Sequence, residues 1–346
     1  MKTQTVFPKG YVMSSFNNQA SFPSYRPRRL RSKAALRELV RETILAPSDF
    51  IWPLFVMDGE DSAYPIPSMP GISRHTIDRL PNLAAKAKSL GIPAICIFPY
   101  TQPTLKTEDC KEAWNSNNLT NKAIRAIKDA VPEILVMTDI ALDPYNVKGH
   151  DGIVRDGQIV NDETVEALVK MGAAQASAGA DIIGPSDMMD GRIGALRTML
   201  EQNGSQNVCI LSYSAKFASN FYAPFRDAVG ATSALDGDKN TYQLDYANGD
   251  EAMRMIARDI AEGADMIMVK PGMPYLDICY RAKKQFRVPT FAYQVSGEYA
   301  MIQSVNNHEH VDETKAMLES LLAFKRAGCD GILTYFAPVA AELLNR

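Results

Sequence analysis

Two lysines stand at the ends of apolar runs, where amine chemistry is most easily placed. The run MIMV ends at Lys270 and is followed at once by Pro271 and Gly272, which break a strand. Lys216 closes the run VCILSYSA in the same way. Alone, either lysine would more often be a solvated surface cation. A lysine that attacks a carbonyl must be neutral, so its pKa has to fall from about 10.4 toward about 7 to 8. Burial and a second ammonium nearby both lower it, and the pair therefore predicts imine formation.

Carboxylates gather after two other apolar runs. Asp139 lies inside the run ILVMTDIAL, and Asp143 and Asp151 follow it. Such carboxylates could relay protons or hold a divalent cation, although the DP and DG dipeptides fit plain turns equally well. Ser186 and Asp187 follow the run DIIGP at the equivalent level, and a turn is again the plain account.

A long polar stretch after Lys216 exceeds an ordinary barrel loop. It contains Gly230 and Gly237, and its length predicts a lid over a site. Arg226 and Lys239 in this stretch could clamp a carboxylate, although solvated loop cations are commoner.

These residues need strands whose carboxyl ends share one face. Eight apolar, strand-like runs begin near Phe50, Ala94, Ile134, Asp181, Val208, Met266, Pro289 and Gly331. Segments with a helical period lie between most of them, at 121–130, 162–178, 192–202, 251–262 and 312–327. This alternation predicts an α/β fold with a parallel sheet, and eight units predict a closed (β/α)8 TIM barrel. A doubly wound open sheet is the alternative, but no Gly-rich phosphate turn follows the first run.

Composition narrows the class of protein. The 346 residues are 46% hydrophobic, with a formal net charge of −3, so they can bury a large core and offer no basic footprint for nucleic acid. The five cysteines show no CxxC spacing, and no apolar run is long enough to span a bilayer. We expect a cytoplasmic protein with no nucleic-acid or membrane partner.

The chain is expected to have two parts. Residues 1–34 carry prolines and aromatics with no sustained period, so they form either a disordered tail or, as their aromatics favour, an arm for subunit contacts. Residues 35–346 are expected to form the catalytic barrel domain.

Four motifs give the chain a family resemblance. SYSAKFASNFYAPFRDAVG, MVKPGMPYLD, PSDMMDGRIGA and YQVSGEYAMI closely resemble the porphobilinogen synthase family, also called 5-aminolevulinate dehydratase. The resemblance runs from about Pro27 through most of the chain. It implies a hydro-lyase that condenses two molecules of 5-aminolevulinate to porphobilinogen through lysine Schiff bases, in tetrapyrrole and heme biosynthesis. Members are commonly homo-octamers whose dimers embrace through N-terminal arms, and some exchange with hexamers. The resemblance therefore implies a homo-oligomer, with an octamer expected, although the composition of the arm does not fix the number of subunits.

The resemblance also assigns roles to single residues. Lys270 matches the lysine that binds the substrate of the propionate side, and Lys216 the one for the acetate side. Asp143 and Asp151 are candidates for assisting proton transfer. Arg226, Lys239 and Gln243 match the lid residues around the acetate-side substrate, and Ser296 and Tyr335 match the hydroxyls that bind the carboxylate of the other substrate. Tyr293 and Phe225 match walls of the pocket. Ser186 and Asp187 match residues near the reacting amine.

The metal requirement follows from departures within the family pattern. Zinc-dependent members carry three cysteines where this chain has Ala141, Asp143 and Asp151, so it resembles the bacterial type without the zinc cysteines and no catalytic zinc is expected. The position aligned with the glutamate that binds allosteric magnesium in some bacterial relatives is Met255. Any Mg²⁺ is therefore expected to be loosely bound or non-essential. The resemblance assigns no metal ligand and no organic cofactor.

Two other functions stay open from the residues alone. A Schiff-base aldolase on the same barrel needs one essential lysine and would survive loss of the other. A non-catalytic relative would use the barrel for assembly or ligand binding and form no imine, and the intact lysine pair argues against it.

Overall fold

The structure is a computed structural model, and it describes residues 22–230, 235, 237–305 and 311–346. The chain divides into two compact units, Met1–Ile44 and Leu45–Arg346. The described part of the first unit contains η1 (Pro27–Arg31) and α1 (Ala34–Leu39), and neither helix buries a residue.

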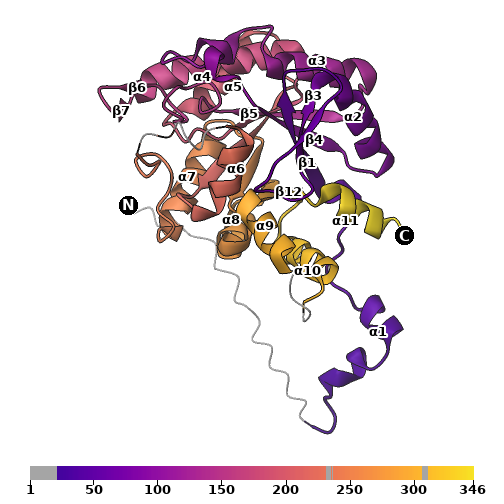
Figure 1. The fold of residues 1–346 in the computed structure, drawn as a ribbon. Coiled ribbons are helices and arrows are strands. Elements are labelled where there is room, and N and C mark those ends of the chain that lie inside the picture. The colour runs from indigo at the N-terminus through magenta and orange to yellow at the C-terminus, as the bar shows by residue number, and fades with distance from the viewer. Residues whose placement is uncertain (1–21, 231–234, 236, 306–310) are drawn as a thin grey trace, which may run out of the picture. The chain divides into compact units, whose positions relative to one another are not determined.

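Eight parallel strands of the second unit close into a barrel. Neighbouring strands pair in the order β12-β11-β10-β9-β8-β5-β4-β1, and the pairing of β1 with β12 closes the ring. All eight apolar runs are strands, so the predicted TIM barrel is confirmed (Figure 1). The strands are β1 (Phe50–Met57), β4 (Ala94–Pro99), β5 (Leu135–Ile140), β8 (Ile182–Pro185), β9 (Cys209–Lys216), β10 (Met266–Lys270), β11 (Thr290–Gln294) and β12 (Gly331–Thr334).

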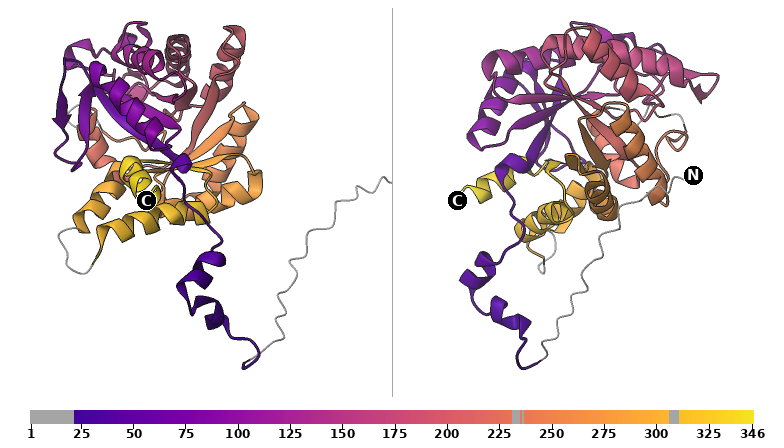
Figure 2. Two further views of the ribbon diagram at one scale, coloured as in Figure 1. Left: turned by 90° about the vertical axis from the view of Figure 1, so that its right-hand side faces the viewer. Right: turned by 180° about the vertical axis from the view of Figure 1, so that it is seen from behind.

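Helices surround the strands, as the views in Figure 2 show. The five predicted helical segments are α3, α4, α5, α7 and α10, with small differences at their ends. The longer helices of the second unit are α2 (Leu80–Ser89), α3 (Leu119–Ala130), α4 (Asn161–Ala178), α5 (Arg192–Gln202), α7 (Gly249–Ala261), α8 (Leu276–Phe286), α9 (Ser296–Ser304), α10 (Glu313–Arg326) and α11 (Ala337–Leu344).

Short elements decorate the barrel, and the sequence pattern did not predict them because two to six residues carry no clear period. The strands β2 and β3 extend the sheet beside β1, and β6 pairs with β7 in a separate hairpin. These elements are β2 (Ala63–Pro65), β3 (Ser73–Thr76), β6 (Val154–Arg155), β7 (Gln158–Ile159), α6 (Ala223–Ala228), η2 (Pro47–Asp49), η3 (Ile77–Arg79), η4 (Pro103–Leu105), η5 (Lys111–Trp114), η6 (Asn220–Tyr222) and η7 (Met273–Tyr275).

Three aspartates fix the heights of neighbouring strands. Each stands just before a strand, and its carboxylate accepts the backbone N–H at the start of the adjacent strand while pairing with a cation from a helix. The three sets are Asp181 with Val136 and Lys128, Asp265 with Ile210 and Arg197, and Asp330 with Thr290 and Lys283. The pairing of β9 with β10 starts with Met266 opposite Leu211, and a shift of one residue between Ile267 and Val269 then sets Lys270 opposite Lys216.

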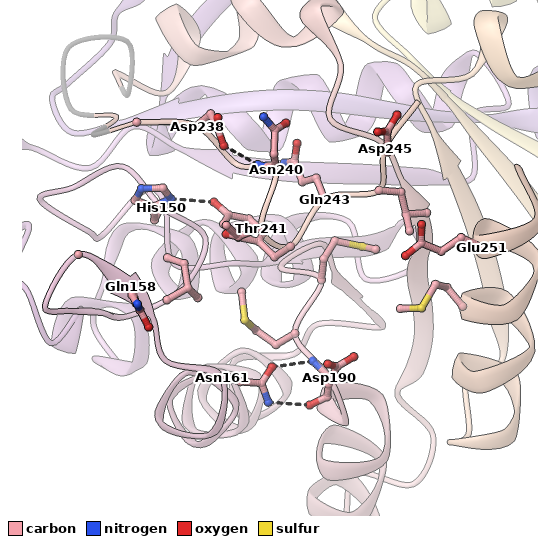
Figure 3. Close-up of a pocket in the computed structure, with 18 residues that line it drawn as sticks. His150, Gln158, Asn161, Asp190, Asp238, Asn240, Thr241, Gln243, Asp245 and Glu251 are labelled. Carbon is pink, nitrogen blue, oxygen red and sulfur yellow. Dashed lines mark hydrogen bonds between the residues drawn. The ribbon is translucent and has the colours of Figure 1, made fainter. Parts of the chain in front are cut away.

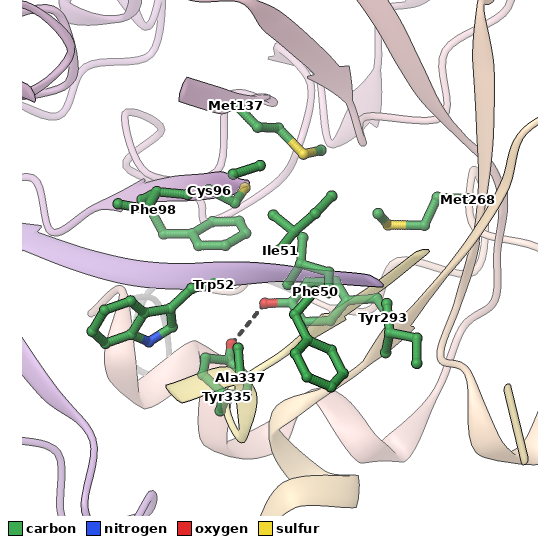
Figure 4. Close-up of a cluster of buried hydrophobic side chains, with 14 of the residues drawn as sticks. Phe50, Ile51, Trp52, Cys96, Phe98, Met137, Met268, Tyr293, Tyr335 and Ala337 are labelled. Carbon is green, nitrogen blue, oxygen red and sulfur yellow. Dashed lines mark hydrogen bonds between the residues drawn. The ribbon is translucent and has the colours of Figure 1, made fainter. Parts of the chain in front are cut away.

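The barrel interior is filled by side chains rather than left open. Cys96, Met137 and Met268 are fully buried there, beside the phenol rings of Tyr293 and Tyr335 (Figure 4). All five cysteines are free thiols. Over the described ranges, no helix is long and apolar enough to cross a membrane.

Candidate active site

Two lysines end adjacent strands at the carboxyl face of the barrel. Lys216 closes β9 and Lys270 closes β10, and the parallel pairing sets them directly opposite each other. Each is only 5% exposed. Two buried amines therefore lie side by side at the end of the barrel where barrel enzymes carry out their chemistry.

Aromatic rings surround the Lys270 amine. Its Nζ lies 4.7 to 5.3 Å from four ring centres, those of Tyr213, Tyr222, Phe225 and Tyr293. The rings favour the ammonium form, whereas burial and, after it, the charge of Lys216 lower the pKa of Lys270 to about 8. Lys270 therefore carries a substantial neutral fraction at pH 8, which is the nucleophilic form.

Lys216 is held by hydrogen bonds instead of rings. Its Nζ donates to the backbone carbonyl of Ser186 at 2.5 Å and to Asp151 Oδ2 at 3.5 Å. These contacts direct the amine toward the loop that follows β8 (Ile182–Pro185), so Ser186 contributes through its backbone.

Asp143 and Asp151 form a buried charge cluster with a third lysine. Lys239 Nζ donates to Asp151 Oδ1 at 3.1 Å and to Asp143 Oδ2 at 3.5 Å. Burial alone would raise the pKa of Asp151, but Lys216 and Lys239 outweigh it and hold that pKa at about 2. Burial raises the pKa of Asp143, against the opposing charge of Lys239. Asp151 is therefore suited to balancing charge, and Asp143 is better suited to carrying a proton.

Two residues of this cluster occupy positions that match zinc ligands in other members of the resembled family. The three positions that match the zinc cysteines are Ala141, which has no donor atom, and Asp143 and Asp151, whose oxygens already face ammonium groups. Among the residues that the structure describes, no group of three or more His, Cys, Asp or Glu could hold a metal ion. The residues present do not fit a zinc site.

Asp139, one of the carboxylates that the sequence analysis considered for proton relay, lies close enough to both lysines for their charges to lower its pKa. Its Oδ1 is buried and has no hydrogen-bond partner. Burial raises the pKa of Asp139 to about 6, while the charges of Lys270 and Lys216 lower it. A carboxyl group that titrates near neutrality beside both amines can exchange protons with a bound substrate.

The expected lid begins directly at the lysine strands. Phe217 N–H donates to the Lys270 carbonyl at 2.9 Å, and Leu244 N–H donates to the Lys216 carbonyl at 3.0 Å. The lid is described except for residues 231–234 and 236. Arg226 is half-buried and makes no hydrogen bond or ion pair within the described part of the chain, so its guanidinium is available.

Gln243, also in the lid, lines a cavity of about 850 Å³ (Figure 3). Asp190 and Met255 line the same cavity, but neither Lys216 nor Lys270 does. The cavity therefore does not contain the two amines.

Four further candidates form two pairs. The hydroxyls of Tyr293 and Tyr335 hydrogen-bond at 2.7 Å within the barrel interior (Figure 4). Ser296 Oγ accepts the N–H of Phe225 at 2.9 Å, which ties the start of α9 to the lid. The structure thus gives Ser296 a backbone partner in the lid and gives Tyr335 a phenol partner.

Asp187 lies next to a buried ion pair between Arg192 and Asp259 that the sequence analysis did not identify. Asp187 Oδ1 accepts the N–H of Met189 at 2.7 Å, and its Oδ2 has no hydrogen-bond partner. Burial raises the pKa of Asp187 to about 6, while Arg192 opposes that shift. Arg192 itself donates to Asp259 at 2.7 Å, and all three charged side chains are fully buried. The loop that carries the carbonyl partner of Lys216 is thereby anchored.

Comparison with known proteins points to one enzyme family. The family profile described as delta-aminolevulinic acid dehydratase matches residues 24–343. The delta-aminolevulinic acid dehydratase of Rhodobacter capsulatus is 58% identical over 324 residues, which cover 94% of this chain and 98% of that protein. The protein of the same name from Bradyrhizobium diazoefficiens is 56% identical over 320 residues, covering 92% of this chain and 91% of that protein.

A solved structure matches as well. It is the delta-aminolevulinic acid dehydratase (porphobilinogen synthase) of Toxoplasma gondii in complex with the reaction product porphobilinogen. It aligns with a TM-score of 0.90 at 46% identity, covering 92% of this chain and 91% of that one. Sequence and fold therefore agree on the same family.

The lowered pKa of Lys270 predicts its reactivity. Formaldehyde with a borohydride reductant should methylate Lys270 at a rate that rises as the pH passes through about 8, because only the neutral amine attacks. Peptide mass spectrometry would follow the reaction, with Lys315, whose side chain is 83% exposed, as an internal reference for the reagent. A midpoint at the ordinary lysine value of about 10.4 would contradict the assignment.

Proposed function

The chain belongs to the delta-aminolevulinic acid dehydratase family, and from that premise we propose that Lys270 and Lys216 carry its reaction as imines of the two substrate molecules. The enzyme is a porphobilinogen synthase, a hydro-lyase of tetrapyrrole biosynthesis. The observation that supports these roles most strongly is the register of the two buried lysines at the ends of β9 and β10.

Imine formation accounts for the need for a neutral amine. Lys270 attacks the ketone carbon of 5-aminolevulinate, and one water leaves as the C=N bond forms. The imine withdraws electrons from the adjacent carbon, which makes its C–H bond easier to deprotonate. Lys216 binds the second molecule in the same way. Joining the two molecules to the pyrrole product releases both lysines, and two waters are lost in total.

Proton transfers are assigned by pKa and position. Burial raises the pKa of Asp139 to about 6, so this carboxyl group can accept and return protons near neutral pH. Burial also raises the pKa of Asp143, which makes it the second candidate for carrying a proton. The pKa of Asp151 is held at about 2, so it keeps its negative charge, 3.5 Å from the Lys216 amine.

Substrate carboxylates have two sets of candidate partners. Arg226, Lys239 and Gln243 of the lid are proposed for the acetate-side molecule, and Ser296 and Tyr335 for the other. The guanidinium of Arg226 is unpaired in the described chain, which supports a role in binding an anion. Lys239 must leave Asp143 and Asp151 to reach a substrate carboxylate, so binding would rearrange the charge cluster.

Trapping tests the two lysines. Borohydride reduction with 5-aminolevulinate present should attach substrate mass to Lys270 first and to Lys216 less readily, because the pKa of Lys270 is lowered to about 8. Peptide mapping by mass spectrometry identifies each site. Label on other lysines alone would exclude both assignments, and a chain that keeps most of its activity after either lysine is replaced would be an aldolase-like enzyme instead.

We further propose that the enzyme needs no zinc, and that any Mg²⁺ acts weakly. The oxygens of Asp143 and Asp151 already face ammonium groups, and Ala141 supplies no ligand. Met255 lines the cavity beside the lid, and a thioether binds a hard cation poorly. A cytoplasmic location is the setting we expect for this reaction.

A chelator tests the metal proposal. Activity should survive prolonged treatment with a strong chelator within about a factor of two, because no step depends on a bound metal. Metal analysis of the purified protein by mass spectrometry provides the control. Stoichiometric zinc, or complete inactivation that zinc alone reverses, would contradict the proposal.

The N-terminal unit is proposed to be an arm that builds a homo-oligomer, with an octamer expected. The two described helices of this unit bury no residue, and Leu39 is 81% exposed, so residues 22–44 have no core of their own. Apolar side chains without a core are commonly covered by another subunit.

Truncation tests the arm. A chain without residues 1–30 should form a smaller assembly and lose activity while the barrel stays folded, because the arm contributes contacts between subunits. Light scattering gives the size, circular dichroism the fold, and product assay the activity. An unchanged assembly with full activity would mean that the segment is only a tail.

A further inference from the structure

A buried carboxylate holds the turn that follows Lys270. Glu298, in the first turn of α9, is fully buried, and one of its oxygens accepts the N–H of Val295 at 2.6 Å and that of Gly272 at 3.4 Å. Its other oxygen accepts the N–H of Met273 at 2.5 Å. No cation pairs with Glu298 in the described part of the chain, and burial raises its pKa to about 7. Three backbone N–H groups therefore stabilise its charge.

Part of this arrangement is ordinary helix capping. A glutamate at the third helical position often bonds back to the residue before the helix, so that bond alone implies nothing more. Capping does not require Gly272 or Met273, which belong to the turn after Lys270. A Cβ on Gly272 would lie 2.4 Å from the Phe324 ring, so the turn is confined on that side too. The carboxylate of Glu298 thus serves a segment outside its own helix.

The same helical turn contacts the lid. Ser296 Oγ accepts the N–H of Phe225 at 2.9 Å. A Cβ on Gly297 would lie 2.5 Å from the carbonyl oxygen of Phe221, an approach that only glycine allows. Three consecutive residues of α9 therefore join two segments: the first two contact the lid and the third holds the turn of Lys270.

We propose that Glu298 is a positioning residue that couples the lid to the imine at Lys270. It touches no reacting atom and acts through the backbone of Gly272 and Met273. Its carboxylate holds the turn after Lys270 at a fixed position relative to the lid. The Lys270 amine and the lid therefore reach the arrangement needed for imine formation together. The inference rests on the proposal that Lys270 forms an imine with the substrate.

The direct test is Glu298→Gln. The amide oxygen can keep the bonds to Val295 and Gly272, but the amide NH₂ then faces the Met273 N–H, so two donors meet. Borohydride trapping with 5-aminolevulinate should slow at Lys270 by about tenfold or more, because small misplacements of a reacting group have large effects on rate. Trapping at Lys216 should stay within about twofold. The kcat value should fall more than KM rises, because binding groups are untouched.

A matched control separates positioning from general destabilisation. Leu168→Ala removes a fully buried side chain of α4, remote in sequence from the turn, and lowers stability by leaving a cavity. It should reduce trapping at both lysines equally or at neither. Equal loss at both lysines in Glu298→Gln, or no loss at either, would overturn the inference. Failure of the wild-type chain to trap any substrate would instead overturn the proposed imines.

A second variant keeps the test decisive if Glu298→Gln does not fold. Gly297→Ala pushes the lid away from α9 through the Phe221 backbone and leaves Glu298 in place. Hydrogen exchange measured by mass spectrometry should then rise in the lid and also in the turn that contains Gly272 and Met273, and trapping should fall selectively at Lys270. Faster exchange in the lid alone, with trapping at Lys270 unchanged, would show that the two segments are independent and overturn the coupling.

Discussion

The burial of two like charges side by side is the constraint on which the rest of the site depends. Lys216 and Lys270 lie opposite each other on neighbouring strands, and each is almost wholly removed from water. Two ammonium groups so placed oppose each other's charge, so one of them is held closer to its neutral form. Asp151 and Lys239 make the arrangement tolerable, because the carboxylate balances Lys216 while the third ammonium balances the carboxylates. The neutral, nucleophilic form of Lys270 is thus favoured by burial and by the charge of Lys216.

The positions of these charged groups depend on the barrel strands and on the lid. Asp265 ties the start of β9 to the start of β10, and the register shift between Ile267 and Val269 sets Lys270 opposite Lys216. The lid is attached to the ends of β9 and β10 by the backbone hydrogen bonds of Phe217 and Leu244. Lys239 lies in this lid, and its ammonium pairs with Asp143 and Asp151. A movement of the lid that carried Lys239 away would leave these two carboxylates without that partner.

The sequence predicted the parts of the structure that rest on periodicity and on strand ends. Apolar runs and helical periods specified all eight barrel strands and five helices, and strand ends brought Lys216 and Lys270 together, because parallel strands in a barrel expose their carboxyl ends on one face. The short strands β2, β3, β6 and β7 escaped prediction because so few residues carry no period.

Other features of the site could not be predicted because no local sequence pattern indicates them. Glu298 reads as an ordinary helix cap, and only the fold brings the N–H groups of Gly272 and Met273 to it. The pairing of Arg192 with Asp259 joins two helices distant in sequence. Lys239 suggested a substrate clamp, and its contacts with Asp143 and Asp151 appear only when the lid is placed. Sequence patterns specify which residues end a strand, whereas these contacts depend on packing between segments.

The most direct measurement is the pKa of Lys270 in a chain that carries Lys216→Met. It can be obtained from the pH dependence of reductive methylation at Lys270, with Lys239→Met as a matched loss of a more distant ammonium. The account predicts that the pKa of Lys270 rises above about 8 when Lys216 is removed, because one of the two causes that lower it is gone, and stays near 8 when Lys239 is removed. A pKa of Lys270 that is unchanged or lower in Lys216→Met would contradict the claim that the two ammonium groups control each other.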